Sequence, residues 1–374
     1  MARLREVEMI HVRMPLVAPF RTSFGTQTVR DVLLLHVTTD AADGWAECVA
    51  LEEPLYSSEY VKGAHAVIKE HLLPRLFSRG DTCAEDVEAA LAPISGHRMA
   101  KAAVETAILD AQLRAEGMSM GTYLGAAREM VDCGVSVGIM DSIPALLTAV
   151  EAFLAEGYKR IKLKIEPGWD VEPVTAVRER FGADLLLQVD ANTAYTLDDA
   201  AHLAKLDGCN LLLIEQPLPE EEILAHAKLA RLITSPICLD ESIVSSGVAA
   251  DAIEMGACAI INIKPGRVGG YIESRRIHDV CAAREIPVWC GGMLETGIGR
   301  AANLALAALP NFSLPGDTSG SARYYTQDLT PPFVLNDGQL RVPTAPGIGV
   351  EVLRDVVDHL TTSSEVVTAK HLGA

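Results

Sequence analysis

Polar and apolar residues alternate along the first part of the chain and then recur at helical spacing. Over residues 1–55, the segments VEMIHVRMPL, RDVLLLHVTT and GWAECVA alternate as paired strands do, with Gly and Asp where turns are expected. From about 58 to 126 the apolar period becomes helical, most clearly in GHRMAKAAVETAILDAQLRAEG. The pattern therefore predicts an α+β domain over residues 1–128, with strands followed by helices.

Strand and helix patterns then alternate over residues 129–324. Short apolar runs, each followed by a helical segment, include CGVSVGI, RIKLKI, LLLQVD, LLLIEQ, PICLD, AIINIK and PVWCGG. Repeated strand–helix units indicate a parallel sheet, and this number of them indicates a closed barrel of the α/β class. The turn-rich tail, about 325–374, is expected to return to the first domain and complete it.

Composition adds constraints without changing this picture. The chain has 374 residues, of which 49% are hydrophobic, so it is long enough for more than one domain and a large core. Its polar, alternating start does not resemble a signal peptide, and no stretch is apolar enough to span a membrane. The eight cysteines show no CxxC spacing, so reduced and mostly buried thiols are expected. These features favour a cytoplasmic protein.

The net charge of −18 argues against nucleic acid or an anionic membrane surface as a partner. It does not argue against a small anionic substrate, because such a substrate would meet local cations at Lys162, Lys164, Lys264 and Arg267.

Three carboxylates stand where apolar strands end, at Asp190, Glu215 and Asp240. Together with Lys164 and Lys264 they are spaced by 26, 25, 25 and 24 residues, about one strand-plus-helix unit. Parallel barrel strands place their C-terminal ends on one rim, where active sites of such folds lie. Three oxygen ligands from neighbouring strands suit a hard divalent ion, with Mg²⁺ favoured. Any one of these residues could instead cap the following helix, but their shared register favours a metal site.

Lysines accompany these carboxylates on the flanking strands. Lys162 and Lys164 are two residues apart, so their side chains share one face, while aliphatic residues occupy the alternate positions. We expect both lysines to point into the barrel, where burial is costly unless the charge is used; the alternative is a solvated pair at an edge. Lys264 ends INIK before a Pro-Gly turn. Nearby cations should lower a lysine pKa, while carboxylates oppose that shift.

Together these segments resemble the enolase superfamily, specifically its muconate-lactonizing-enzyme subgroup. The Lys-x-Lys at 162–164, the carboxylates Asp190, Glu215 and Asp240, and Lys264 match its pattern, and the resemblance covers essentially the whole chain. It implies an α+β capping domain over a modified (β/α)7β TIM-like barrel. It also implies an enzyme that abstracts the proton α to a carboxylate and stabilises the enolate with Mg²⁺, which Mn²⁺ or Co²⁺ could replace.

Further segments narrow the resemblance. PLVAPFRTSFGTQ, GHRMAKAAVE, CGVSVGIMD, KPGRVGG and WCGGMLETGIGRAAN are similar to o-succinylbenzoate synthases that also racemise N-acylamino (N-succinylamino) acids. The resemblance implies Lys164 and Lys264 as bases on opposite sides of a small carboxylate substrate, with Lys162 stabilising the intermediate. Racemisation would need both bases, whereas the dehydration of menaquinone biosynthesis would need one. Members of the family form homo-oligomers, octamers among them.

Residues around this centre are assigned to substrate binding and support. The expected pocket residues are Ser136, Asn192, Arg267, Phe20, Leu51, Gly292, Met293 and Ile298. Glu241 and Asp317 are expected to support the site from behind; alternatively, Glu241 caps a helix, and Asn192 and Asp317 belong to turns. The segment 20–24 is either a mobile capping loop or an ordinary hairpin turn. The histidines of the helical segments, His202, His226 and His278, are expected at the surface.

Other functions remain open on the residues alone. A muconate cycloisomerase or a dipeptide epimerase would use the same metal and lysines with a different pocket. A Schiff-base aldolase would use Lys264 or Lys164 to attack a carbonyl, but it would have no use for three metal-spaced carboxylates. A non-catalytic barrel should lack a ligand or a lysine, and none is missing.

Overall fold

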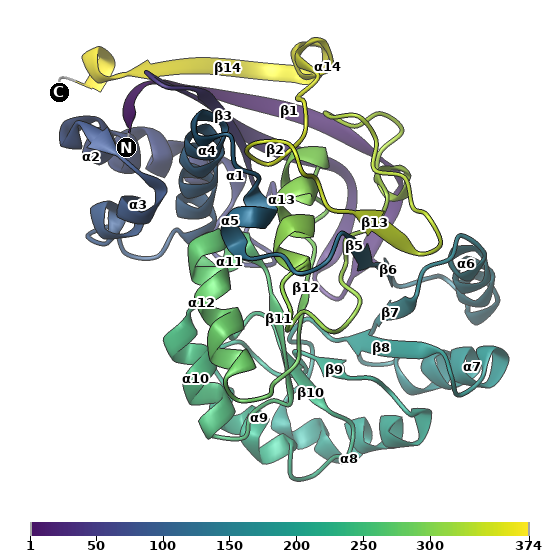
Figure 1. Cartoon of the computed structure of the whole chain (residues 1–374). Helices are drawn as coiled ribbons and strands as arrows, with labels where there is room; N and C mark the ends of the chain where they lie inside the picture. Colours follow the sequence, from purple (N-terminus) through teal and green to yellow (C-terminus); the bar gives the residue numbers. More distant parts are fainter. Residues whose placement is uncertain (1, 373–374) are drawn as a thin grey trace.

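An antiparallel sheet and a parallel barrel divide the chain in the computed structural model, which describes residues 2–372 (Figure 1). The antiparallel sheet has the order β14-β1-β2-β3, with β4 paired to β1 at one end. Its first three strands are the ones that the alternating pattern predicts. The bounds in this part are β1 (Ala2–Thr22), β2 (Gly25–Thr39), β3 (Asp43–Cys48) and β4 (Asp81–Thr82).

Helices α1, α2 and α4 pack on this sheet, and we call the unit of β1–β4 and α1–α5 the capping domain. The longest, α4, runs over the predicted helical segment and ends at Gly117, whose φ of +67° suits glycine. It approaches β3 closely, since a Cβ on Gly44 would lie 2.1 Å from the carbonyl oxygen of Ala107. The bounds are α1 (Val61–Val67), α2 (Leu73–Arg79), α3 (Ala84–Leu91), α4 (Arg98–Glu116) and α5 (Met120–Leu124).

The C-terminal segment returns to the capping domain, as the sequence predicts. Strand β14 (Thr361–Thr368) pairs antiparallel with β1, so that Val7 lies opposite Val367. Figure 1 shows β14, β1 and β2 side by side above the barrel. A smaller pairing joins β13 (Gln339–Arg341) to β5 (Met130–Asp132), and α14 (Arg354–Leu360) precedes β14.

Seven parallel strands form the barrel sheet in sequential order from β6 to β12. They confirm the seven apolar runs of the sequence. The sheet closes through the segment 311–317, because Phe312 pairs with Val288 of β12 and Gly316 pairs with Cys133 next to β6. The strand bounds are β6 (Gly134–Val137), β7 (Arg160–Lys164), β8 (Leu186–Asp190), β9 (Ile214–Glu215), β10 (Ile237–Leu239), β11 (Ile260–Ile263) and β12 (Val288–Cys290).

Helices surround this sheet, and serine side chains cap two of them: Ser142 accepts from the amide of Ala145, and Ser245 from that of Val248. Because helices cover the outside of the barrel, their inner faces are buried. The bounds are α6 (Ile143–Ala155), α7 (Val171–Phe181), α8 (Ala200–Leu203), α9 (Ile223–Leu229), α10 (Ser246–Glu254), α11 (Pro265–Val268), α12 (Tyr271–Ala282) and α13 (Gly297–Ala307).

Two histidine predictions are wrong because helical spacing alone does not tell which face of a helix is covered. His226 is fully buried and its Nε2 lies 3.2 Å from the amide nitrogen of Leu218, while His278 stacks on Phe312. His202 remains partly exposed. All eight cysteines are free, as expected, and seven are buried. None of the helices within residues 2–372 combines the length and apolar character of a bilayer-crossing helix.

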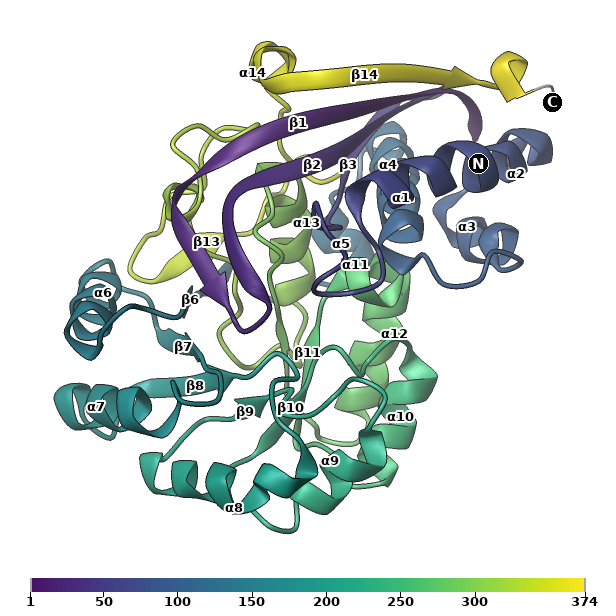
Figure 2. The same ribbon diagram turned by 180° about the vertical axis from the view of Figure 1, so that it is seen from behind.

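The β1–β2 hairpin brings the capping domain onto the rim of the barrel (Figure 2). Its tip lies at residues 23 and 24, between the paired Thr22 and Gly25. The amide of Ile139 donates to the carbonyl of Arg21 over 2.9 Å, and the Arg21 guanidinium lies 2.9 Å from the Glu166 carboxylate. The segment 20–24 is thus a hairpin end that also covers the C-terminal ends of the barrel strands.

Candidate active site

Six charged side chains gather at the C-terminal ends of five neighbouring barrel strands. Lys162 and Lys164 lie on β7, while the three carboxylates and Lys264 end or directly follow β8, β9, β10 and β11. All six are at most 7% exposed. The lysines therefore point inward, as period-two alternation on β7 predicts.

Lys164 and Lys264 lie on opposite sides of the barrel. Three strands, β8 to β10, separate β7 from β11 in one direction around the sheet. In the other direction β12, the closing segment 311–317 and β6 separate them. Both lysines nevertheless line the same cavity, so a substrate in it is approached from two sides.

The two opposed lysines have different partners. Lys164 Nζ donates to Asp190 Oδ2 and to Asn192 Oδ1, each over 2.6 Å. Lys264 Nζ donates to Asp240 Oδ2 over 2.7 Å and to the hydroxyl of Tyr56 over 3.0 Å. Tyr56 belongs to the capping domain, so this lysine is held across the domain boundary.

Lys162 is held by a layer of charged and aromatic groups below it. Its Nζ lies 2.6 Å from Asp317 Oδ2, and the other Asp317 oxygen lies 2.9 Å from Arg160. Lys162 Nζ and the Arg160 guanidinium lie over the ring of Trp289, at 4.8 and 5.1 Å from its centroid. Burial alone would lower the pKa of Lys162, but Asp317 and Glu215 outweigh burial and raise it. Lys162 is therefore a permanent cation.

The carboxylates are crowded enough to affect one another. Burial, followed by the charge of Asp190, raises the pKa of Glu215 to about 8, although Lys162 opposes the shift. For Asp240, the charges of Lys264 and Arg267 outweigh burial and lower the pKa. At Lys264, burial alone would lower the pKa, but the charge of Asp240 outweighs burial and raises it. At Lys162 and Lys264 the carboxylates are the nearest neighbours, so the opposing effect that the sequence suggests is the larger one there.

The three carboxylates can be compared with the ligands that a divalent cation requires. They provide buried carboxylate oxygens from three adjacent strands, which is the ligand chemistry that Mg²⁺ prefers. The raised pKa of Glu215 comes from its burial first and from the charge of Asp190 second. Among residues 2–372, no group of three His, Cys, Asp or Glu side chains is arranged closely enough to hold a metal ion by itself. At the rim, lysine side chains contact the oxygens of Asp190 and Asp240. The residue types fit the cation, and binding would require it to displace lysine contacts.

A cavity of about 50 Å³ lies above this charged layer. Its floor is polar and its sides are largely apolar, so it suits a molecule with a carboxylate at one end and apolar groups beyond. The lining residues are Phe20, Thr22, Phe24, Gln27, Leu51, Tyr56, Ser136, Lys162, Lys164, Asn192, Lys264, Gly292, Met293, Leu294, Asp317 and Tyr324.

Most of the predicted pocket residues meet at this cavity. The structure brings together Phe20, Leu51, Ser136, Asn192, Gly292, Met293 and Asp317. Two others lie elsewhere. Arg267 is buried beneath the site with its guanidinium 2.9 Å from Asp240 Oδ1, and Ile298 lines a separate cavity at the start of α13. Neither lines the cavity, because each belongs to a helix that packs behind the rim.

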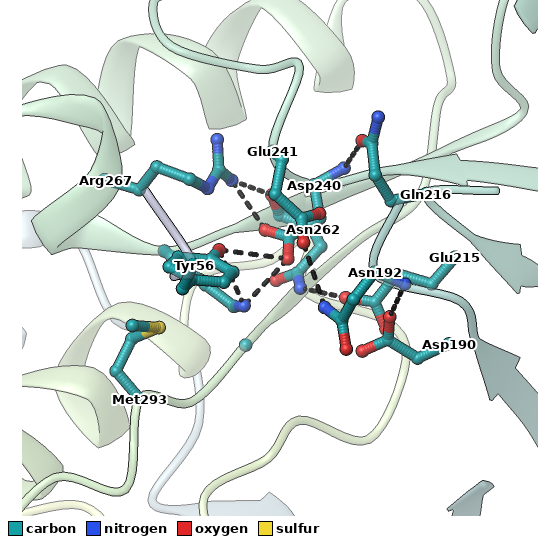
Figure 3. A network of polar contacts seen from close by, with 12 residues as sticks. Tyr56, Asp190, Asn192, Glu215, Gln216, Asp240, Glu241, Asn262, Arg267 and Met293 are labelled. Carbon is teal, nitrogen blue, oxygen red and sulfur yellow. Dashed lines mark hydrogen bonds and ion pairs between the residues drawn. The ribbon is translucent and has the colours of Figure 1, made fainter. Parts of the chain in front are cut away.

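Glu241 supports the site through the side-chain amide of Asn192. Its Oε1 accepts from Asn192 Nδ2 over 2.9 Å (Figure 3). Because Asn192 Oδ1 in turn accepts from Lys164 Nζ, the three residues form a chain. The helix that follows, α10, begins at Ser246, so Glu241 does not cap it. In Figure 3, Asp190 and Glu215 lie together, and Tyr56 and Arg267 lie on the other side of Asp240.

Several site residues were not predicted from the sequence. Asn262 lies two residues before Lys264 and donates to Glu215 Oε1 over 2.7 Å, so the period-two rule could have found it. Tyr56 and Tyr324 lie in irregular segments far away in sequence, and no local pattern marks them. Arg160 shares the inward alternation of Lys162 and Lys164 and is fully buried, so the same rule could have found it.

Comparison with known proteins places this arrangement among described families. Residues 4–125 match the mandelate racemase / muconate lactonizing enzyme N-terminal domain, and residues 145–356 match the enolase C-terminal domain-like family. The chain is 64% identical to an N-succinylamino acid racemase from Amycolatopsis sp, over 96% of this chain and 98% of that protein. It is 46% identical to an o-succinylbenzoate synthase from Geobacillus kaustophilus, over 94% of each. An enolase superfamily member from Listeria innocua has a crystal structure that matches with a TM-score of 0.94 and 40% identity, over 99% of this chain and all of that one.

Proposed function

Because the chain belongs to the enolase superfamily, in its mandelate racemase / muconate lactonizing enzyme group, we propose that it abstracts the proton α to a carboxylate. It is an enzyme of the kind named N-succinylamino acid racemase and o-succinylbenzoate synthase. The substrate we propose is an N-acyl amino acid, above all an N-succinyl amino acid with an apolar side chain. The same site would dehydrate the precursor of o-succinylbenzoate.

The observation that carries this proposal is the placement of two lysines on opposite sides of one cavity. In racemisation Lys164 or Lys264 accepts the α proton at Nζ as the C–H bond breaks, and the electron pair moves toward the carboxylate. The opposite lysine then delivers a proton from its own Nζ to the other face, which forms the new C–H bond. Lys162 stabilises the second negative charge that develops on the carboxylate.

Asp190, Glu215 and Asp240 would hold a divalent cation, for which we propose Mg²⁺ on the basis of their oxygen chemistry. When bound, the cation would supply positive charge at the developing enediolate and lower its energy. It would also compete with Lys264 for Asp240, whose charge raises the pKa of that lysine, and a lower lysine pKa favours base catalysis.

Dehydration uses fewer parts of the same site. Lys164 removes the α proton, the hydroxyl leaves from the adjacent carbon as water with a proton from the same lysine, and a double bond forms. Lys264 then contributes charge rather than a proton. The apolar side chains Phe20, Met293 and Leu294 at the cavity suit the apolar side chain or ring of these substrates. A muconate cycloisomerase or a dipeptide epimerase remains the alternative on the same scaffold.

Removal of divalent ions tests the proposal. The chelated enzyme should racemise no N-succinyl amino acid and dehydrate no o-succinylbenzoate precursor, and Mg²⁺, Mn²⁺ or Co²⁺ should restore both reactions. Titration calorimetry should show one cation per chain, and Asp190→Ala or Asp240→Ala should abolish that binding. Full turnover in excess chelator would refute the metal role. If only a muconate or a dipeptide reacts, the substrate class is wrong.

A further inference from the structure

Gln216 directly follows the site carboxylate Glu215 but takes no part in the reaction proposed above. It is fully buried and does not line the reaction cavity. Its φ is +38°, and the segment after the preceding strand, β8, contains two more positive values, +42° at Asn192 and +66° at Thr193. Residues other than glycine seldom adopt a positive φ, and they keep it where the surrounding structure imposes it. The backbone after two of the three site carboxylates is therefore held by tertiary contacts.

The side chain of Gln216 reaches from the end of β9 to the end of β10. Its Oε1 accepts from the amide of Asp240 over 3.0 Å (Figure 3). The same oxygen accepts from the amide of Ser242 over 3.2 Å. Its Nε2 donates to the Ser242 hydroxyl over 2.8 Å and to the carbonyl of Leu218 over 3.0 Å. These contacts match the two lone pairs and two donors of a side-chain amide, so the side chain has one defined position.

The backbone of Gln216 connects the same part of the barrel rim. Its amide donates to the carbonyl of Cys238 on β10 over 2.9 Å, and its carbonyl accepts from the amide of Thr193, beyond β8, over 2.8 Å. Through its side chain and its backbone, Gln216 thus bonds to the segments at the ends of β8 and β10 while it ends β9 itself. Those three strand ends carry the three site carboxylates. One buried residue therefore joins all the segments that would supply cation ligands.

We propose that Gln216 is a positioning residue that fixes the spacing of Asp190, Glu215 and Asp240, and that this spacing favours Mg²⁺ over Ca²⁺. Mg²⁺ demands near-ideal octahedral geometry with oxygens at about 2.0–2.1 Å, whereas Ca²⁺ accepts oxygens at about 2.3–2.6 Å in flexible arrangements. Carboxylates on separate strand ends meet the narrower requirement only if those ends are held together. Without the side-chain amide of Gln216 the end of β10 is free to move from β9, and affinity for the smaller ion falls first. This inference rests on the cation site of the proposed function.

Titration calorimetry of the full chain with Mg²⁺ alone and with Ca²⁺ alone tests the proposal. Gln216→Met keeps the length of the side chain but none of its hydrogen bonds. Its Kd for Mg²⁺ should rise by about 10–100-fold, the usual cost of removing a residue that orients metal ligands. Its Kd for Ca²⁺ should rise by less than about threefold, because the flexible ion tolerates the altered spacing. A glutamine that only stabilises the fold would change both Kd values by the same factor.

Two further variants support this measurement. If Gln216→Met does not fold, Gln216→Asn replaces it, because asparagine tolerates a positive φ but is one methylene too short to reach the amide of Asp240. It should shift the ratio of the two Kd values in the same direction. The matched control is Gln112→Met. Gln112 belongs to α4 of the capping domain, and its Oε1 accepts from the amide of Ala84 over 3.0 Å, so both Kd values should stay as in wild type.

Hydrogen exchange measured by mass spectrometry tests the spacing without any cation. In Gln216→Met or Gln216→Asn the segment 240–242 should lose protection by about three- to tenfold, the factor that one amide hydrogen bond contributes, while the segment 260–263 of β11 keeps wild-type protection. Equal changes of both Kd values, or unchanged protection of 240–242, overturn the proposal and leave the proposed function intact. If wild type binds neither cation, the proposed cation site is refuted, and the selectivity with it.

Discussion

Lys164 and Lys264 face the same cavity, but different parts of the molecule hold them. The partners of Lys164, Asp190 and Asn192, come from the barrel, and Glu241 supports Asn192 from behind. Lys264 also has a barrel carboxylate, Asp240, but its second partner is Tyr56 of the capping domain, whose ring lies 4.7 Å from the lysine Nζ.

This difference separates the two lysines by their direct partners: the barrel alone supplies those of Lys164, whereas the capping domain supplies one of those of Lys264. On the Lys264 side, α11 and α12 follow the lysine directly and pack on α4 of the capping domain. Any change that loosens the docking should therefore reach Lys264 before it reaches Lys164.

The largest expected effect comes from removing either lysine. Lys164→Ala and Lys264→Ala should each reduce racemisation by at least about 10³-fold, within the range of general acid–base contributions. Each variant should still exchange the α proton of one enantiomer with D₂O, because the remaining base reaches its own face of the substrate. Proton NMR of each enantiomer with each variant measures this. Dehydration should need Lys164 as base and tolerate Lys264→Ala better.

The contrast between the two lysines would be refuted if a single variant exchanged the α proton of both enantiomers with D₂O. That result would mean that one lysine reaches both faces, and the opposite placement of β7 and β11 would have no consequence. Lys159→Ala is a suitable control, since this lysine precedes the same strand but pairs with Asp337 at the surface.

The sequence predicted the barrel side of the site far better than the capping side. Strand alternation places Lys162 and Lys164 inward, and strand ends place Asp190, Glu215 and Asp240 on one rim, because those relations are local and periodic. Tyr56 depends on how two domains meet, and no local period records that. Arg267 and Ile298 do not line the reaction cavity, because both lie near the start of helices whose direction behind the rim a loop pattern does not specify.

The second prediction tests the difference between the two lysines through single hydrogen bonds. Tyr56→Phe keeps the ring beside Lys264 but removes its hydroxyl, and α-proton exchange through Lys264 should fall by about tenfold, the value of one hydrogen bond to a charged group. Exchange through Lys164 should change by less than about twofold. Asn192→Ala should show the reverse selectivity, because it removes the acceptor 2.6 Å from Lys164. Equal losses at both faces in either variant would contradict the division into two sides.

The smallest expected effect concerns the docking of α4 on the Lys264 side. Glu105 of α4 is buried and accepts from the amide of Ile272 over 3.2 Å at the start of α12, and Gly270 leaves room for its carboxylate. Burial raises its pKa to about 8 from an ordinary value of 4.5. Because the folded protein holds this proton more tightly than the unfolded chain, the stabilisation is complete below about pH 4.5 and is lost as the pH rises through about 8.

Glu105→Gln imitates the neutral acid and removes this titration. At pH 7 the wild-type group is largely protonated, so kcat and KM of the variant should differ by less than about twofold. In urea unfolding, the free energy of unfolding of wild type should fall by about 1–3 kcal/mol more than that of the variant between pH 5 and pH 9, as expected for an ionised group buried without full compensation. Glu254→Gln, at an exposed glutamate of α10, is the control and should follow wild type. If wild type and Glu105→Gln lose the same unfolding free energy between pH 5 and pH 9, the Glu105 contact does not stabilise the docking of the two domains. The dependence of Lys264 on the capping domain would then rest on Tyr56 alone.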